Sequence, residues 1–411
     1  MTKIPDRLLI KFGLFNFLLV AILGAIMRYK IVWSLPFLNQ KHLQEAHSHF
    51  AFYGWVSSII YLLMVHSAKE ILPAKQLYKY KTIIILNFVA SYGMLFSFLY
   101  GGYYWGSIFW SAIALFLSFG ILSLWVKDYK HLQHPSKVWF LGGLFFASFS
   151  SLGVFSLAYM KAFGIIHQSL YWASTLFYLH FQYNGFFVLS CIGIILSTLP
   201  LQQKDSYKHS LIFGAFALST LCSYTLSITW ISNSKWLLGI SLLGNIIQLL
   251  AIYGLACLIK KYLKISLKKY TSLEKITFSI VIISYFFKVI LQQLSAIPEI
   301  SQWVFGFRAI VIAYLHLILL VCISSFLLLQ IITRYGFHQS KTTKIGLILY
   351  LVFVLLNELI LAQIGLLSLV GMYWRWSPIM LWWISIAIVL AITLIFAGLK
   401  KKNKEEIYSS L

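Results

Sequence analysis

Two histidines, His47 and His49, stand close together inside a long apolar stretch. An imidazole can ligate a metal or carry a proton, and hydrocarbon penalises one without a partner, so a histidine in a membrane segment indicates a functional site. Two residues are about 200° apart on a helix, so the two rings face different neighbours. The face of His47 continues through the small residues Ala51, Gly54 and Ser58, whereas that of His49 carries bulky side chains. This pattern predicts a flat gap beside His47 and makes it the expected ligand of a planar macrocycle.

Two further histidines, His180 and His316, lie inside later apolar segments. His180 and Asn184 are four residues apart and therefore share a helix face. The helical rise places all four membrane histidines in one half of the bilayer or near its middle, as a cofactor held between helices requires. Alternatively, each ring hydrogen-bonds to a backbone carbonyl or a hydroxyl inside the bundle, and the sequence leaves both interpretations open.

Lys288 and Glu358 are the charged residues that fall deepest within apolar segments. Charged groups in hydrocarbon are costly, so they either pair with each other or mark a pathway for ions or protons. Both interpretations stay open at this point, because the sequence does not show whether the two helices are neighbours.

The composition is that of a polytopic helical membrane protein. Of the 411 residues, 60% are hydrophobic and only 10% are charged. The formal net charge of +23 resides mainly in short loops between apolar runs, which favours a membrane topology signal over nucleic-acid binding. The four cysteines lie within apolar segments at no metal-like spacing and are expected to be packing residues.

Hydropathy predicts an all-α fold with about twelve transmembrane helices in a single membrane domain over residues 1–411. No repeat and no separate soluble domain are apparent. The predicted segments are 8–29, 43–66, 81–101, 104–126, 138–158, 167–198, 209–231, 236–259, 273–296, 307–333, 344–370 and 374–399.

The helix-two, helix-six and helix-ten motifs resemble subunit I of the haem–copper oxidase superfamily, nearest its nitric oxide reductase and cbb-type branches. That family has a twelve-helix core with histidine ligands on helices two, six, seven and ten. His47-Ser-His49-Phe resembles the His-x-Asn pattern around the low-spin haem ligand of helix two. Tyr314-Leu-His316 keeps the second histidine of the His-x-His pattern on helix ten. The resemblance implies a low-spin haem b ligated by His47 and His316, with His49 beside it.

Two other stretches extend the resemblance. His180-Phe-Gln-Tyr-Asn184-Gly185 is similar to the His-x-x-x-Glu-Gly pattern of helix six, with asparagine in place of glutamate. The resemblance gives His180 the position of a ligand to the family's second metal. Gly371-Met-Tyr-Trp-Arg375 is similar to the stretch before helix twelve whose arginine holds haem propionates.

The chain departs from the family at the second metal site. Helix seven of the family supplies adjacent histidines, but the seventh segment here has Ser223-Tyr-Thr225 in that region and no membrane histidine. Tyr314 stands where the high-spin haem ligand is expected. One imidazole is too few ligands for a stable copper or iron site, which argues against copper.

The expected function is therefore that of a cytochrome b-like membrane protein that transfers electrons through one haem b. Bis-imidazole ligation leaves no open position for a substrate, so whether the protein is an enzyme is left open. An electron donor and partner subunits of a respiratory chain are implied by the resemblance. The alternatives are an active oxygen or nitric oxide reductase with unusual ligands, such as Tyr314, and a cofactor-free transporter or scaffold.

Orientation follows from the basic residues of the loops. Of 33 Lys and Arg residues, 25 belong to one side of the predicted topology and 7 to the other. The positive-inside rule therefore places both termini in the cytoplasm, across the inner (cytoplasmic) membrane. Tags at either end are expected to be cleaved by protease only after the membrane is opened to the cytoplasmic side. Cleavage of both tags from the periplasmic face of intact cells would contradict this orientation.

Overall fold

The computed structural model describes residues 5–132, 134–165, 167–202, 205–231, 234–335 and 337–401 and is built almost entirely of helices. Its elements are α1 (Asp6–Val32), α2 (Gln40–Phe50), η1 (Ala51–Ser57), α3 (Ser58–Ser67), α4 (Ala74–Gly101), α5 (Trp105–Asp128), η2 (Tyr129–His131), α6 (Ser136–Phe149), α7 (Ser151–Phe163), α8 (Gln168–His180), η3 (Phe181–Phe187), α9 (Val188–Leu196), α10 (Ser206–Ser223), η5 (Tyr224–Ile228), α11 (Lys235–Ser266), η6 (Leu267–Lys269), α12 (Ser272–Leu294), α13 (Pro298–Gly306), α14 (Arg308–His316), η7 (Leu317–Ser324), α15 (Ser325–Arg334), β1 (Phe337–Gln339), α16 (Lys341–Leu369), α17 (Ser377–Gly398) and β2 (Leu399–Lys401).

Twelve continuous helical stretches in the described residues are long and apolar enough to cross a membrane. Each coincides with one of the twelve segments that hydropathy predicts, so the all-α polytopic fold is confirmed. The largest differences concern the third span, which begins at Ala74 rather than 81, and the eighth, which runs to Lys269 rather than 259. Such a protein resides in a lipid bilayer, where helices satisfy their own backbone hydrogen bonds.

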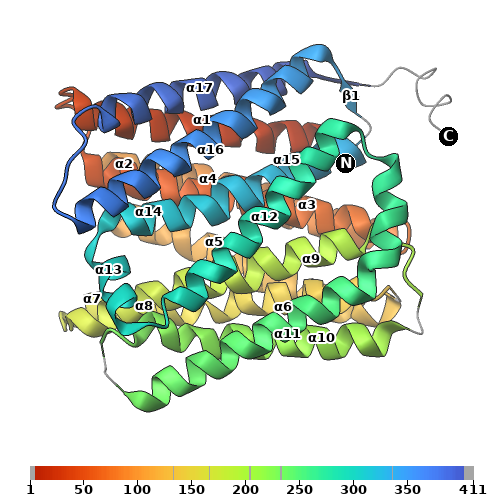
Figure 1. Cartoon of the computed structure of the whole chain (residues 1–411). Helices are drawn as coiled ribbons and strands as arrows, with labels where there is room; N and C mark the ends of the chain where they lie inside the picture. Colours follow the sequence, from red (N-terminus) through yellow and green to blue (C-terminus); the bar gives the residue numbers. More distant parts are fainter. Residues whose placement is uncertain are drawn as a thin grey trace.

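The spans run side by side as one bundle, and α1 begins at the same end at which α17 finishes (Figure 1). At that end β1 and β2 pair antiparallel, with Phe337 opposite Lys401. The short helix α13, which hydropathy does not predict, lies at the opposite end between the ninth and tenth spans.

In the part of the chain that the structure describes, three spans contain a π-helical segment, and each segment follows a histidine. His180 and His316 are the last residues of α8 and α14, directly before η3 and η7. In the second span, one residue, Phe50, lies between His49 and the start of η1. These are the second, sixth and tenth spans, each separated from the next by three others. The expectation that the chain lacks an obvious repeat therefore misses a local feature that recurs every four spans. π-helical turns are rare and frequently mark functional sites.

Side chains from neighbouring spans satisfy the backbone around η1. Asn87 donates to the carbonyl of Tyr53 at 3.0 Å, and Asn16 donates to that of Gly54 at 2.8 Å. The Ser58 hydroxyl donates to the same Tyr53 carbonyl at 2.7 Å. A π turn leaves carbonyls short of donors, and in hydrocarbon no water replaces them, so these bonds fix η1 against α1 and α4.

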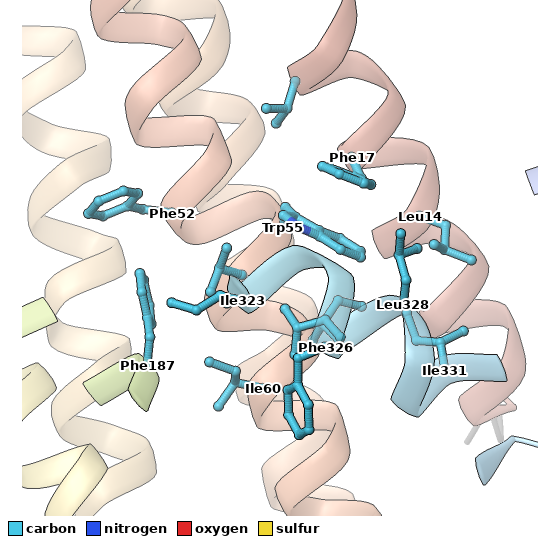
Figure 2. Packing of buried hydrophobic residues seen from close by; sticks show 14 of the residues in the cluster. Leu14, Phe17, Phe52, Trp55, Ile60, Phe187, Ile323, Phe326, Leu328 and Ile331 are labelled. Carbon is cyan, nitrogen blue, oxygen red and sulfur yellow. The ribbon is translucent and has the colours of Figure 1, made fainter. Parts of the chain in front are cut away.

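The second and tenth spans meet at Trp55. Its indole N–H donates to the hydroxyl of Ser324 at 2.9 Å, and its ring stacks on Phe17 with centroids 4.4 Å apart. Figure 2 shows Trp55 among buried side chains of α1 and α15, including Phe326 and Leu328. The core is thus centred on the helices that carry π segments.

Arg334 joins the second, sixth and tenth spans near the ends opposite their π segments. Its guanidinium donates to the hydroxyls of Ser67 and Ser197 at 3.1 and 3.3 Å, and to the carbonyl of Ile194. The two serine hydroxyls lie 2.9 Å apart. One planar cation with five donors therefore joins the second, sixth and tenth spans.

We expect Arg334→Ala to destabilise the bundle by about 2–4 kcal/mol, because three bonds to a half-buried cation are lost. Arg334→Lys keeps the charge but not the fork, and its loss is expected to be intermediate. Thermal unfolding of the detergent-solubilised protein measures both. Lys344→Ala, at an exposed basic residue near the same end, is the control. Equal melting temperatures for Arg334→Ala and this control would contradict the role assigned to Arg334.

Candidate functional site

His47 is held by α1 through one ring nitrogen. Its Nδ1 lies 3.0 Å from the carbonyl oxygen of Val20. A carbonyl only accepts, so Nδ1 carries the proton and Nε2 keeps its lone pair. Gly24, one turn further along α1, lies beside the ring, since a Cβ at that position would be 3.4 Å from Cε1. Metal-ligating histidines are often oriented by a backbone carbonyl at the second ring nitrogen, and the Val20 carbonyl lies in that position here.

The flat gap expected along Ala51, Gly54 and Ser58 does not exist in that form. The space beside Gly54 holds the ring of Phe50, whose Cε2 would be 2.9 Å from an added Cβ. The prediction counts 100° per residue along the whole stretch, but the helix changes to π geometry at Ala51. The space beside His47 is instead lined by Gly24 of α1.

His49 faces other neighbours, as its two-residue offset from His47 requires. Its Nδ1 lies 2.9 Å from the carbonyl of Glu45, and its Nε2 lies 3.2 Å from the hydroxyl of Tyr103. The ring stacks on Phe98 with centroids 4.2 Å apart. Both ring nitrogens are therefore engaged by protein groups, so His49 has a structural role in this geometry.

His180 is also engaged at both nitrogens. Its Nε2 donates to the carbonyl of Thr220 at 2.8 Å, and its Nδ1 accepts from the amide of Asn184 at 3.1 Å. The ring is buried. The residue that the resemblance assigns to a second metal thus joins the sixth span to the seventh.

His316 differs from these two rings. Its Nδ1 is buried and has no hydrogen-bond partner, and it lies 3.9 Å from Oε1 of Glu358. That distance allows electrostatic attraction but no hydrogen bond. The other carboxylate oxygen, Oε2, is likewise buried without a partner, while Oε1 accepts from the side chain of Asn357 at 2.8 Å. Orphaned buried polar atoms are rare and call for an explanation.

The structure brings His47 and His316 into electrostatic range of each other and of one guanidinium, that of Arg28. Arg28 also interacts with Glu358. We refer to His47, His316, Arg28 and Glu358 as the histidine–arginine cluster. Arg28 is not among the site residues expected from the sequence, although a basic residue near the end of a predicted span was an available signal.

Arg375, the predicted propionate anchor, is placed elsewhere. Its side chain is exposed, and its guanidinium lies 5.3 Å from the centroid of the Trp376 ring. The cation that interacts with His47 and His316 is Arg28. Arg375 is therefore a cation–π partner in the loop before α17.

Lys288 and Glu358 do not form the ion pair that the sequence left open. Lys288 is buried and donates to Oε1 of Gln292 at 2.5 Å, and Gln292 in turn donates to Asn245 and Gln248 at 3.2 and 3.0 Å. Glu358 interacts with Asn357, His316 and Arg28 instead. The two charges belong to separate polar groups.

Comparison of the sequence with known families and with curated proteins finds no relative. No known family profile matches the chain, and no curated protein matches it. Within the residues that the structure describes, no group of three or more His, Cys, Asp or Glu side chains is arranged to hold a metal ion.

We expect His180 and Asn184 to contribute to stability as a unit. His180→Ala removes the shorter of two side-chain bonds to the Thr220 carbonyl, which keeps the Ser223 hydroxyl at 3.4 Å, and a loss of about 1–3 kcal/mol is expected. Asn184→Ala should cost less, and the double variant should cost clearly less than the two losses added together, because the residues share one network. Chemical unfolding of the four proteins measures the coupling. Additive losses would show that the pair does not act as a unit.

Proposed function

We propose that this protein is a cytochrome b-like electron-transfer protein with the helical arrangement of a haem–copper oxidase subunit I. It holds one low-spin haem b between the second and tenth spans, with His47 and His316 as axial ligands, and no copper. The observation that carries the proposal is the contrast among the four membrane histidines. In His49 and in His180, both ring nitrogens are hydrogen-bonded to protein groups. In contrast, His47 has no hydrogen bond at Nε2, and His316 has none at either ring nitrogen within the described residues.

The residues of the cluster fit such a group. Two imidazoles on facing spans suit a bis-imidazole haem, and the Val20 carbonyl orients His47 for ligation. Arg28 has no acceptor at hydrogen-bond distance in the described chain, so its fork is available to a carboxylate such as a propionate. When bound, haem b supplies a one-electron redox centre.

The protein groups around this position have roles of their own. The positive charge of Arg28 interacts with both imidazoles. This charge favours the binding of a reduced or anionic group over that of a neutral one. Glu358 lies 3.9 Å from Nδ1 of His316, so its carboxylate attracts the ring electrostatically without a hydrogen bond. Only His47 has a hydrogen bond that orients its ring, the one to the Val20 carbonyl.

The alternatives receive less support. A cofactor-free scaffold or transporter accounts for His49 and His180, but it gives no role to His316, which has no hydrogen bond within the described residues, or to the unbonded Nε2 of His47. A reductase needs a second metal, and the one histidine at that position is hydrogen-bonded on both sides. We further propose the cytoplasmic membrane as the location, both termini in the cytoplasm, and respiratory partner subunits as electron donor and acceptor.

We expect one haem b per chain by pyridine haemochrome assay, with no stoichiometric copper by metal analysis. His47→Ala and His316→Ala should each abolish the low-spin spectrum, because either change removes an axial ligand. His49→Ala and His180→Ala, matched substitutions at engaged histidines, should keep it. Arg28→Ala should weaken haem retention more than Arg375→Ala does.

Two outcomes would overturn these assignments. Loss of the spectrum in His49→Ala but not in His47→Ala would move the ligand by two residues. A wild-type protein that is folded, purified with haem supplied during expression and colourless would exclude the cytochrome function.

A further inference from the structure

A groove of about 720 Å³ opens on the outside of the bundle between α1 and α4, with Phe396 of α17 at its side. Its walls are leucine, isoleucine, valine and aromatic side chains, and Leu8 and Val89 are 56% and 51% exposed. Along α1 the groove extends from Leu8 to Phe15, which is about 10 Å at 1.5 Å per residue. Half of the hydrocarbon core is about 15 Å thick, so the groove lies within one leaflet, the one at which α1 begins.

Aromatic rings give the groove a fixed wall. Phe12 lies edge-on to Phe88 with ring centroids 5.0 Å apart, and its centroid is 5.6 Å from that of Tyr92. The Tyr92 hydroxyl donates to Oδ1 of Asn16 at 2.8 Å, and Asn16 donates to the Gly54 carbonyl in η1. The wall is therefore anchored to the second span. Lipid tails are as apolar as this wall, so apolar packing alone does not select what occupies the groove.

Lys11 is the charged residue in the described lining of the groove. It is half-buried, and it makes no ion pair or hydrogen bond with the described residues. Cations close to it are engaged: Lys81 lies 2.5 Å from a carboxylate oxygen of Asp6, and Arg7 donates to the Tyr335 carbonyl at 2.8 Å. An ammonium at the edge of hydrocarbon is costly without an anion, so Lys11 requires a negative group in the groove.

The surroundings of Lys11 are basic as well. Residues 5–11 and 69–81, which the ion pair of Asp6 and Lys81 brings together, carry six basic and two acidic side chains. Such a field attracts a headgroup with net negative charge and repels the ammonium of a zwitterionic one. Basic pockets between transmembrane helices are known to bind anionic headgroups in this way.

We propose that this groove binds one anionic glycerophospholipid, with an acyl chain against the aromatic wall and the phosphate at Lys11. The lipid belongs to the leaflet at which α1 begins, which is the cytoplasmic leaflet in the orientation proposed above. Lys11 is five residues, or about 7.5 Å, from the start of α1, and its flexible stem extends the ammonium towards the headgroup level. The site is separate from the histidine–arginine cluster and does not depend on haem.

The test is a lipid titration of the full chain in detergent, followed by native mass spectrometry, which measures the affinity for the first lipid bound. The probes are phosphatidylglycerol and phosphatidylcholine with the same acyl chains. Wild type is expected to bind phosphatidylglycerol at least about fivefold more tightly, the effect of one basic residue on an anionic headgroup. Lys11→Gln should remove most of this preference. Lys275→Gln, at an exposed lysine of α12, should keep it.

A second pair of variants places the site. Val89→Trp, at a lining residue of α4, should lower the affinity for phosphatidylglycerol at least about fivefold by filling the groove. Leu86→Trp is the matched control on the same helix, at a residue that is 46% exposed and outside the lining. The melting temperature of each variant shows whether it is folded.

Each contrary outcome has a definite meaning. Equal wild-type affinity for the two lipids overturns the anionic class. Unchanged affinity for phosphatidylglycerol in folded Lys11→Gln overturns the role of Lys11, and in folded Val89→Trp it overturns the location. A dimer of this chain that forms in wild type, excludes the lipid and is lost in Val89→Trp overturns lipid as the occupant.

Discussion

A backbone carbonyl that loses its helical donor inside hydrocarbon must find another within the protein, and the centre of this bundle is arranged around that constraint. Asn16 and Asn87 donate to carbonyls of η1, and the Ser324 hydroxyl donates to the carbonyl of Leu319 at 2.7 Å in η7. The same Ser324 hydroxyl accepts from Trp55. Ser324 therefore satisfies an irregular turn and also joins the second and tenth spans, while Asn16 and Asn87 join η1 to the first and third.

The histidines can be interpreted only with those turns in place. The offset between His47 and His49 was sufficient to predict that they face different neighbours, because both precede η1. The continuation of the His47 face to Gly54 and Ser58 failed, because it crosses into π geometry. An α turn and a π turn do not differ in hydropathy, so no pattern in the sequence separates them.

Hydropathy predicted the twelve spans because it depends on neighbouring residues alone. The partners of buried polar groups depend on which helices meet, and there the sequence was insufficient. Lys288 and Glu358 invited pairing as opposite charges, yet Lys288 donates to Gln292 and Glu358 lies near Arg28. Arg375 lies in a stretch similar to a propionate-binding motif, but its side chain is exposed. The apolar segments were sufficient to place the four histidines inside spans, and only tertiary contacts distinguished engaged rings from available ones.

The π segments have a consequence for how such a helix tolerates change. A seven-residue π segment turns through about the same angle as an α-helix that is one residue shorter, so removing one residue from η1 would restore an ordinary α-helix and leave the faces before and after it in register. His47 would still face Val20, while the carbonyls that Asn16 and Asn87 satisfy would regain helical donors. η1 is thus the place where this span tolerates a change of one residue, whereas the same deletion within α3 would turn His47 by about 100° relative to the residues that follow.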